Sequence, residues 1–182
     1  MARPAPGPSA IETATARFSS ITAEPVSPAR RPYRSAIRAQ SVADATGAVA
    51  QAASAETPDS VVFDLDPGDR AGLPECARVA LMLRELLARV GLASWVKTSG
   101  KKGLHVYVPL NRRETTFEDT KAFSRAVAAA LHQEHPDLVT AKMAREHRAG
   151  KVFINWSQNG ASMTMVCVYS LRAEEQPTVS SP

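Results

Sequence analysis

The sequence has few aromatic residues, few cysteines and no long apolar run. Only 5% of its 182 residues are aromatic, although 44% are hydrophobic. The two cysteines, Cys76 and Cys167, lie too far apart for the short spacings of zinc or dithiol motifs. No stretch approaches membrane-spanning length, and no signal peptide is evident. These absences predict a reduced, cytoplasmic, single-domain protein without a membrane partner.

The first third of the chain also has few large apolar residues and no lysine. Residues 1–59 are rich in Ala, Pro, Ser, Thr and Arg, and every lysine lies at position 97 or later. A segment with so little apolar surface to bury is expected to be disordered, apart from a weak helix over 41–55. We therefore predict a boundary between residues 1–59 and residues 60–182.

The chemistry centres on Val61–Gly68, which reads V-V-F-D-L-D-P-G. The apolar run predicts a buried strand ended by Pro67 and Gly68. Side chains alternate along a strand, so Asp64 and Asp66 share one face and repel each other. A divalent cation relieves that repulsion, and hard ions such as Mg²⁺ or Mn²⁺, which also bind phosphate oxygens, fit best. The alternative is a strand that merely carries two acids near a turn.

Two helices and several further strands follow. Apolar residues at helical spacing predict helices over Pro74–Val90 and Thr116–Glu134. Alternation predicts strands at 94–98 and 104–108, and a closing pair at 151–156 and 164–169. The pattern of strands and helices indicates an α/β (α+β) fold.

The turn Ser99–Gly103 and the residues after it are the second candidate site. Its serine, two lysines and two glycines form a plausible phosphate cradle, and an ordinary charged hairpin turn is the alternative. His105 stands just inside the next strand, where a lone polar side chain needs a partner. Residues 140–151 are basic, either as a solvated face or as a contact for a phosphate backbone. The net charge of +4 is compatible with nucleotide or nucleic-acid partners.

Four motifs occur in order: Asp64-Leu-Asp66-Pro, Ser99-Gly-Lys-Lys-Gly-Leu-His105, Gly150-Lys-Val-Phe-Ile-Asn155-Trp-Ser-Gln-Asn and Tyr169-Ser-Leu-Arg-Ala. Together they resemble the polymerase domain of bacterial ATP-dependent ligase D, in the archaeo-eukaryotic primase superfamily. The resemblance covers about residues 60–182.

The resemblance implies an RRM-like palm, a mainly antiparallel sheet flanked by helices that holds two divalent ions. It implies that Asp64 and Asp66 bind metal, that Asn155 occupies a third catalytic position, and that Ser99, Lys102, His105 and Arg172 hold a triphosphate. The implied function is nucleotide addition at DNA ends or gaps during non-homologous end joining, in the bacterial nucleoid and alongside other end-joining proteins.

The sequence departs from that family in three ways. Asn155 stands where the family has a third aspartate, and the segment 161–168 lacks the Lys or Gln that usually contacts the nucleotide. The family's N-terminal half is not recognisable in residues 1–59, so we expect an incomplete domain preceded by an unrelated, out-of-frame segment. These departures predict a truncated chain with negligible nucleotide addition.

Two other functions fit parts of the sequence. A non-catalytic remnant that binds nucleotide or DNA agrees with Asn155 and with the unrecognised N-terminal half. A D-x-D phosphatase also begins with an apolar strand, but that family has Gly-Thr after its second aspartate, where this chain has Pro67-Gly68. It also needs a later acidic pair for Mg²⁺, which this sequence lacks.

Overall fold

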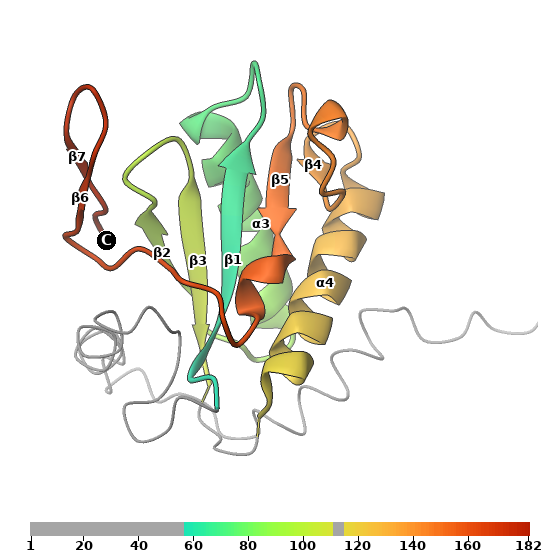
Figure 1. Cartoon of the computed structure of the whole chain (residues 1–182). Helices are drawn as coiled ribbons and strands as arrows, with labels where there is room; N and C mark the ends of the chain where they lie inside the picture. The colour runs from blue at the N-terminus through green and yellow to red at the C-terminus, as the bar shows by residue number, and fades with distance from the viewer. Residues whose placement is uncertain (1–56, 111–114) are drawn as a thin grey trace, which may run out of the picture.

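A computed structural model describes residues 57–110 and 115–182 (Figure 1). The predictions made for residues 1–56, disorder and a weak helix over 41–55, lie outside the described residues. In the described part, no helix is both long and apolar enough to cross a membrane.

One five-stranded sheet forms the centre of the described fold. Its order is β2 (Trp95–Thr98), β3 (Leu104–Pro109), β1 (Ser60–Pro67), β5 (Val152–Asn155) and β4 (Val139–Thr140). The central strand β1 pairs antiparallel with β3 and β5, and only the short β4 runs parallel to its neighbour. The mixed α/β fold and the mainly antiparallel sheet predicted from the sequence are confirmed.

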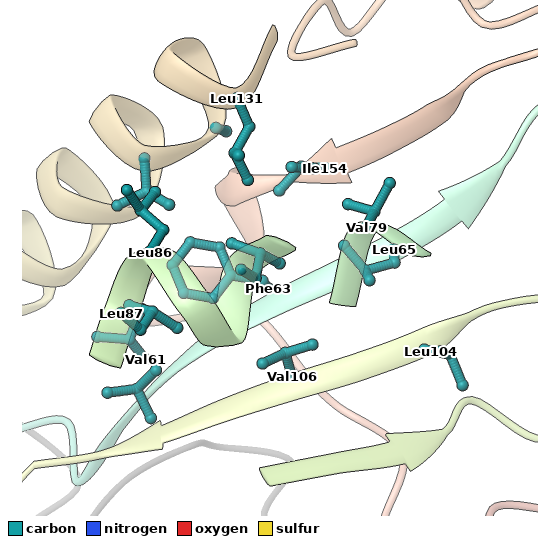
Figure 2. Close-up of a cluster of buried hydrophobic side chains, with 14 of the residues drawn as sticks. Val61, Phe63, Leu65, Val79, Leu86, Leu87, Leu104, Val106, Leu131 and Ile154 are labelled. Atoms are coloured by element: carbon teal, nitrogen blue, oxygen red, sulfur yellow. The ribbon is translucent and has the colours of Figure 1, made fainter. Parts of the chain in front are cut away.

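Two helices, α3 (Leu73–Arg89) and α4 (Phe117–Glu134), cover one face of this sheet (Figure 1). Alternate residues of β1 point toward them, and Val61, Phe63 and Leu65 are fully buried in the resulting core (Figure 2). The Phe63 and Phe123 rings meet edge to face with centroids 6.4 Å apart. Because this face of β1 is filled with apolar side chains, Asp64 and Asp66 must project from the opposite face.

The helix boundaries follow from the capping residues. The Gly72 amide donates to the Glu75 carboxylate at the start of α3, and Gly91, in the left-handed region at φ 76°, follows its end. At the start of α4, Thr116 and Asp119 form a reciprocal capping box. Both predicted helices are confirmed to within a residue or so at each end.

A single asparagine continues the pairing of β1 where β5 ends. After β5 the chain turns into a short 3-10 helix, η2 (Trp156–Asn159), instead of running on beside β1. The side-chain amide of Asn159 makes the hydrogen bonds to β1 that a continuing strand would make. Its Oδ1 accepts from the Val62 amide and its Nδ2 donates to the Val62 carbonyl, both at 2.8 Å. This buried pair fixes η2 against β1.

The prediction of a strand at residues 164–169 is wrong, because this segment pairs with no strand of the sheet. Both edges of β5 are already paired, with β1 on one side and β4 on the other, so this segment has no place beside it. Tyr169 adopts φ 64°, a left-handed conformation that interrupts an extended strand. The segment instead leads to a small hairpin of β6 (Leu171–Arg172) and β7 (Thr178–Val179), which lies near β2 (Figure 1).

Candidate functional site

The face of the sheet opposite the helices carries a pocket of about 670 Å³. Strand β1, the turn between β2 and β3, and the C-terminal hairpin each contribute to its wall. Three acidic and four basic side chains line it: Asp64, Asp66, Glu174, Lys101, Lys102, Arg148 and Arg172. Acids beside several cations are the groups that would hold both a metal ion and phosphates.

The two aspartates of β1 lie next to each other at the floor of this pocket. Asp64 is buried and Asp66 is partly buried. The pKa of Asp66 is raised to about 6, first by burial and then by the negative charge of Asp64, while the nearby Arg148 lowers it. The anionic form of Asp66 is therefore destabilised beside Asp64, in line with the shared face that the alternation of β1 predicted.

His105 lies across from Asp64 on the neighbouring strand. The two residues are register partners in the β1–β3 pair, and His105 Nε2 is 3.4 Å from Asp64 Oδ1. His105 is 5% exposed, and its Nδ1 has no hydrogen-bond partner among the described residues. The sequence predicted that His105 needs a polar partner, and Asp64 is that partner at Nε2.

Asn155 is the register partner of Asp64 on the other side, in β5. Its Nδ2 lies 3.4 Å from Asp64 Oδ2, and its Oδ1 accepts a hydrogen bond of 2.6 Å from Ser157 Oγ. If the Asn155 amide were flipped, its oxygen would face the Asp64 carboxylate, and two hydrogen-bond acceptors would repel each other. The orientation with Nδ2 toward Asp64 is therefore the favoured one. Asn155 thus stands beside the aspartates but presents a donor to them, and it does not line the pocket.

The turn 99–103 packs tightly against β1. Ser99 Oγ accepts from the amides of Lys101 and Gly103, at 3.2 and 3.1 Å, which leaves its own proton free to be donated. A Cβ on Gly103 would lie 2.1 Å from the Leu65 carbonyl oxygen, so only glycine lets the turn come this close. Ser99 and the exposed Lys102 both line the pocket.

The C-terminal hairpin closes the pocket on the side of this turn. Thr178 Oγ1 donates to the Gly100 carbonyl, and Lys101 Nζ forms an ion pair of 2.5 Å with Glu174. A Cβ on Gly100, whose φ is 75°, would lie 2.7 Å from Arg172 Cγ. These contacts bring Arg172 to the wall that faces the aspartates.

Six of the seven residues singled out in the sequence line this one pocket: Asp64, Asp66, Ser99, Lys102, His105 and Arg172. The pocket also includes residues that the sequence did not single out as site residues, notably Arg148, Gln158 and Glu174. Arg148 was visible only as one cation in the basic run 140–151. It reaches the pocket because the Gly68 amide donates to the Lys151 carbonyl, which holds the two loops together.

Arg148 packs its guanidinium group 3.8 Å from the centroid of the Phe153 ring and donates from Nη2 to the Met143 carbonyl. A guanidinium stacked on an aromatic face is held in a defined position. Its charge therefore acts on Asp66 from a fixed place.

The donor set suits a divalent ion that shares its ligands with phosphate. Among the described residues, no group of three or more His, Cys, Asp or Glu side chains is placed to hold a metal. Mg²⁺, however, is commonly bound through one or two carboxylates together with substrate phosphates and water. Asp64 and Asp66 meet that requirement if a phosphate ligand enters the same pocket.

Comparison with known proteins identifies the fold and the family. The chain is 46% identical over 122 residues to the multifunctional non-homologous end joining DNA repair protein LigD of Mycobacterium tuberculosis, covering 67% of this chain and 16% of that protein. It is 32% identical over 132 residues to the bifunctional non-homologous end joining protein LigD of Bacillus subtilis, covering 72% of this chain and 22% of that protein. The solved polymerase domain of Mycobacterium tuberculosis ligase D in complex with DNA superposes with a TM-score of 0.66 at 44% identity, over 69% of this chain and 44% of that one.

The chain therefore spans less than a quarter of the length of these two curated relatives. The family model for the LigD primase-polymerase domain matches residues 31–182, so the match begins upstream of the boundary predicted at residue 60. Because the family model matches most of the chain and the relatives are non-homologous end joining proteins, this chain belongs to the LigD primase-polymerase domains of DNA repair.

Proposed function

We propose that the pocket binds a nucleoside triphosphate together with Mn²⁺ or Mg²⁺, as the nucleotide site of an end-joining polymerase domain. The observation that carries this proposal is the convergence of Asp64 and Asp66 with Ser99, Lys102, His105 and Arg172 on one pocket, from three separate parts of the chain. Dependence on divalent metal is what membership of this family implies.

Each group has a role that its position supports. Asp64 and Asp66 hold the metal, and their mutual repulsion makes the cation the stabilising partner. Lys102 and Arg172 neutralise phosphate oxygens, and Ser99 donates its free hydroxyl proton to one of them. His105 lies against Asp64 through Nε2 and orients that carboxylate, while its Nδ1 is available for a phosphate oxygen. A divalent ion, when bound, supplies charge neutralisation and makes an attacking hydroxyl more acidic.

We expect nucleotide addition by this chain to be impaired because of Asn155. At the position next to Asp64 it supplies a neutral amide, whose oxygen accepts from Ser157 and whose nitrogen faces Asp64. A two-ion site needs anionic ligands to hold two cations about 3.5–4 Å apart against their repulsion. With two carboxylates instead of three, we propose that binding of the nucleotide survives better than its transfer.

The proposed setting is the bacterial cytoplasm at DNA ends or gaps in the nucleoid, with other end-joining proteins. The DNA in the superposed polymerase structure belongs to that protein, and a DNA end is the corresponding partner proposed for this chain. The basic residues Lys142, Arg145 and Lys151 lie in the same segment as the pocket residue Arg148, Arg145 within the short 3-10 helix η1 (Arg145–His147), and they are suited to a phosphate backbone.

A gapped-DNA extension assay with Mn²⁺ and labelled ribo- or deoxyribonucleotides tests the proposal against its alternatives. We expect no measurable extension by the chain as it stands, together with saturable ATP binding by calorimetry, as for a polymerase site that binds nucleotide but transfers it poorly. Robust extension would refute the impairment assigned to Asn155. Release of phosphate from a simple phosphomonoester, without nucleotide binding, would favour a D-x-D phosphatase.

A further inference from the structure

Lys97 is a buried lysine that the proposed chemistry does not use. It lies on β2 directly opposite His105 in the β2–β3 register, and only 4% of it is exposed. Lysine is rarely buried in this way, because its ammonium group loses its hydration. The contacts that compensate for that loss show what the residue does.

The ammonium group binds two acceptors on the C-terminal segment. Lys97 Nζ donates to the Val166 carbonyl at 2.8 Å and to Ser180 Oγ at 2.7 Å. It also lies 5.9 Å from the centroid of the Tyr107 ring. Hydrogen bonds from a charged donor are stronger than neutral ones, and more so when they are buried.

Thr98, the next residue of β2, holds the same end of the chain. The Thr98 amide donates to the Ser181 carbonyl, and the Ser181 amide donates to Thr98 Oγ1, both at 2.7 Å. Ser180 Oγ donates in turn to the Thr98 carbonyl at 2.8 Å, and Ser180 is fully buried. The chain at 180–181 is thereby attached to β2.

The segment between the two acceptors of Lys97 forms one wall of the pocket. Residues 166–180 include the hairpin that carries Arg172, Glu174 and Thr178, and Val166 itself also lines the pocket. Because one ammonium group binds both ends of this segment, the hairpin is closed into a loop at Nζ. Apart from its contacts with the turn 99–103, the hairpin of two-residue strands has little packing to hold it in place.

We propose that Lys97 is a positioning residue: it ties both ends of the segment 166–180 to the sheet and so holds Arg172 at the triphosphate. The inference rests on the proposed function, because it assigns Lys97 a role in the same site without contact with the nucleotide. Lys97 acts through Arg172, and its loss leaves Asp64, Asp66 and the turn 99–103 in place.

Amide hydrogen exchange, measured by NMR on the whole chain without nucleotide, tests the anchoring. Lys97→Met keeps an unbranched side chain as far as Cε and removes the ammonium group. The Tyr169 amide donates to the Ser180 carbonyl, and the Ser180 amide donates to the Ser170 carbonyl. We expect both amides to exchange about 10–100-fold faster. Amides of β1 should not change. The matched control, Lys121→Met on α4, should leave all of these rates unchanged.

A binding cycle separates positioning from general structural support. By calorimetry with ATP and Mn²⁺, Arg172→Ala should weaken binding about 10-fold in the parent chain but less than about 2-fold in Lys97→Met, because Arg172 is already displaced there. Full additivity of the two substitutions would overturn the inference, as would unchanged exchange at Tyr169 and Ser180.

Two further results keep the test decisive. If Lys97→Met does not fold, Ser180→Ala removes one of the two acceptors, and the same exchange and binding changes are expected in weaker form. Their absence in a folded Ser180→Ala variant would overturn the inference. If the parent chain binds no nucleotide while Lys97→Met still accelerates exchange, the proposed function fails and the anchoring role of Lys97 stands.

Discussion

Replacing Asn155 by aspartate restores a third carboxylate beside Asp64. The Asn155 Nδ2 position lies 3.4 Å from Asp64 Oδ2, so the new charge would enter at about that separation. Two unit charges at about 3.4 Å repel by about 1.2 kcal/mol in water and by about 5 kcal/mol at an effective dielectric of about 20. Asn155 is partly exposed, so we expect Asn155→Asp to destabilise the metal-free fold by about 1–3 kcal/mol.

A divalent ion that neutralises the carboxylates removes this repulsion, so the relief adds to the free energy of metal binding. Since a factor of ten corresponds to about 1.4 kcal/mol, Mn²⁺ affinity should rise by about 10–100-fold. Thermal unfolding with EDTA, thermal unfolding with saturating Mn²⁺, and calorimetric Mn²⁺ titration measure both halves of the effect. Metal should stabilise Asn155→Asp more than the parent.

Gln133→Glu is the matched control, because it makes the same amide-to-acid change at an exposed site on α4 that does not line the pocket. It should leave Mn²⁺ affinity unchanged. Equal Mn²⁺ affinities for the parent and Asn155→Asp would refute the reasoning and would show that position 155 is not a metal ligand in this chain.

Three further predictions follow from named contacts. Because the pKa of Asp66 is raised from 3.8 to about 6, the folded state holds that proton more tightly than the unfolded chain, so its contribution to stability is lost as pH rises through about 6. In EDTA, Asp66→Asn should therefore gain melting temperature relative to the parent between pH 4.5 and 7.5, and a constant difference over that range would contradict the shift. His105→Ala should weaken calorimetric ATP binding with Mn²⁺ by about 10-fold, whereas His135→Ala, outside the pocket, should not; equal affinities would remove His105 from the site. Asn159→Ala leaves the Val62 amide and carbonyl without their buried partner and should cost about 2–4 kcal/mol in urea unfolding, and a loss below about 0.5 kcal/mol would show that η2 is held by other contacts.

Local patterns were enough to predict much of the fold. The alternation in Val61–Asp66 placed the two aspartates on the face away from the helices, and capping residues located both helices. These features depend on contacts between residues close in sequence, or on the face of a single strand. The resemblance to the family further indicated which other segments meet at the aspartate strand.

Long-range contacts explain what the sequence did not predict. The segment 164–169 has the composition of a strand, but both edges of β5 were already paired, and that competition cannot be read locally. Arg148 reaches Asp66 only because the loop at Gly68 pairs with Lys151. In the sequence, Lys97 looks like an ordinary exposed lysine on an edge strand. Its burial depends on contacts with Val166 and Ser180, which are distant in the sequence.

The most direct test of the account is a calorimetric titration of ATP into the parent chain, with Mn²⁺ and again with EDTA, repeated on Asp64→Asn. The central claim is that the carboxylates of β1 and the cations of the surrounding loops form one triphosphate pocket that needs a divalent ion. We expect saturable binding with Mn²⁺, loss of binding in EDTA, and binding at least about 10-fold weaker in Asp64→Asn. Binding of equal strength under all three conditions, or no binding by the parent chain with Mn²⁺, would contradict it.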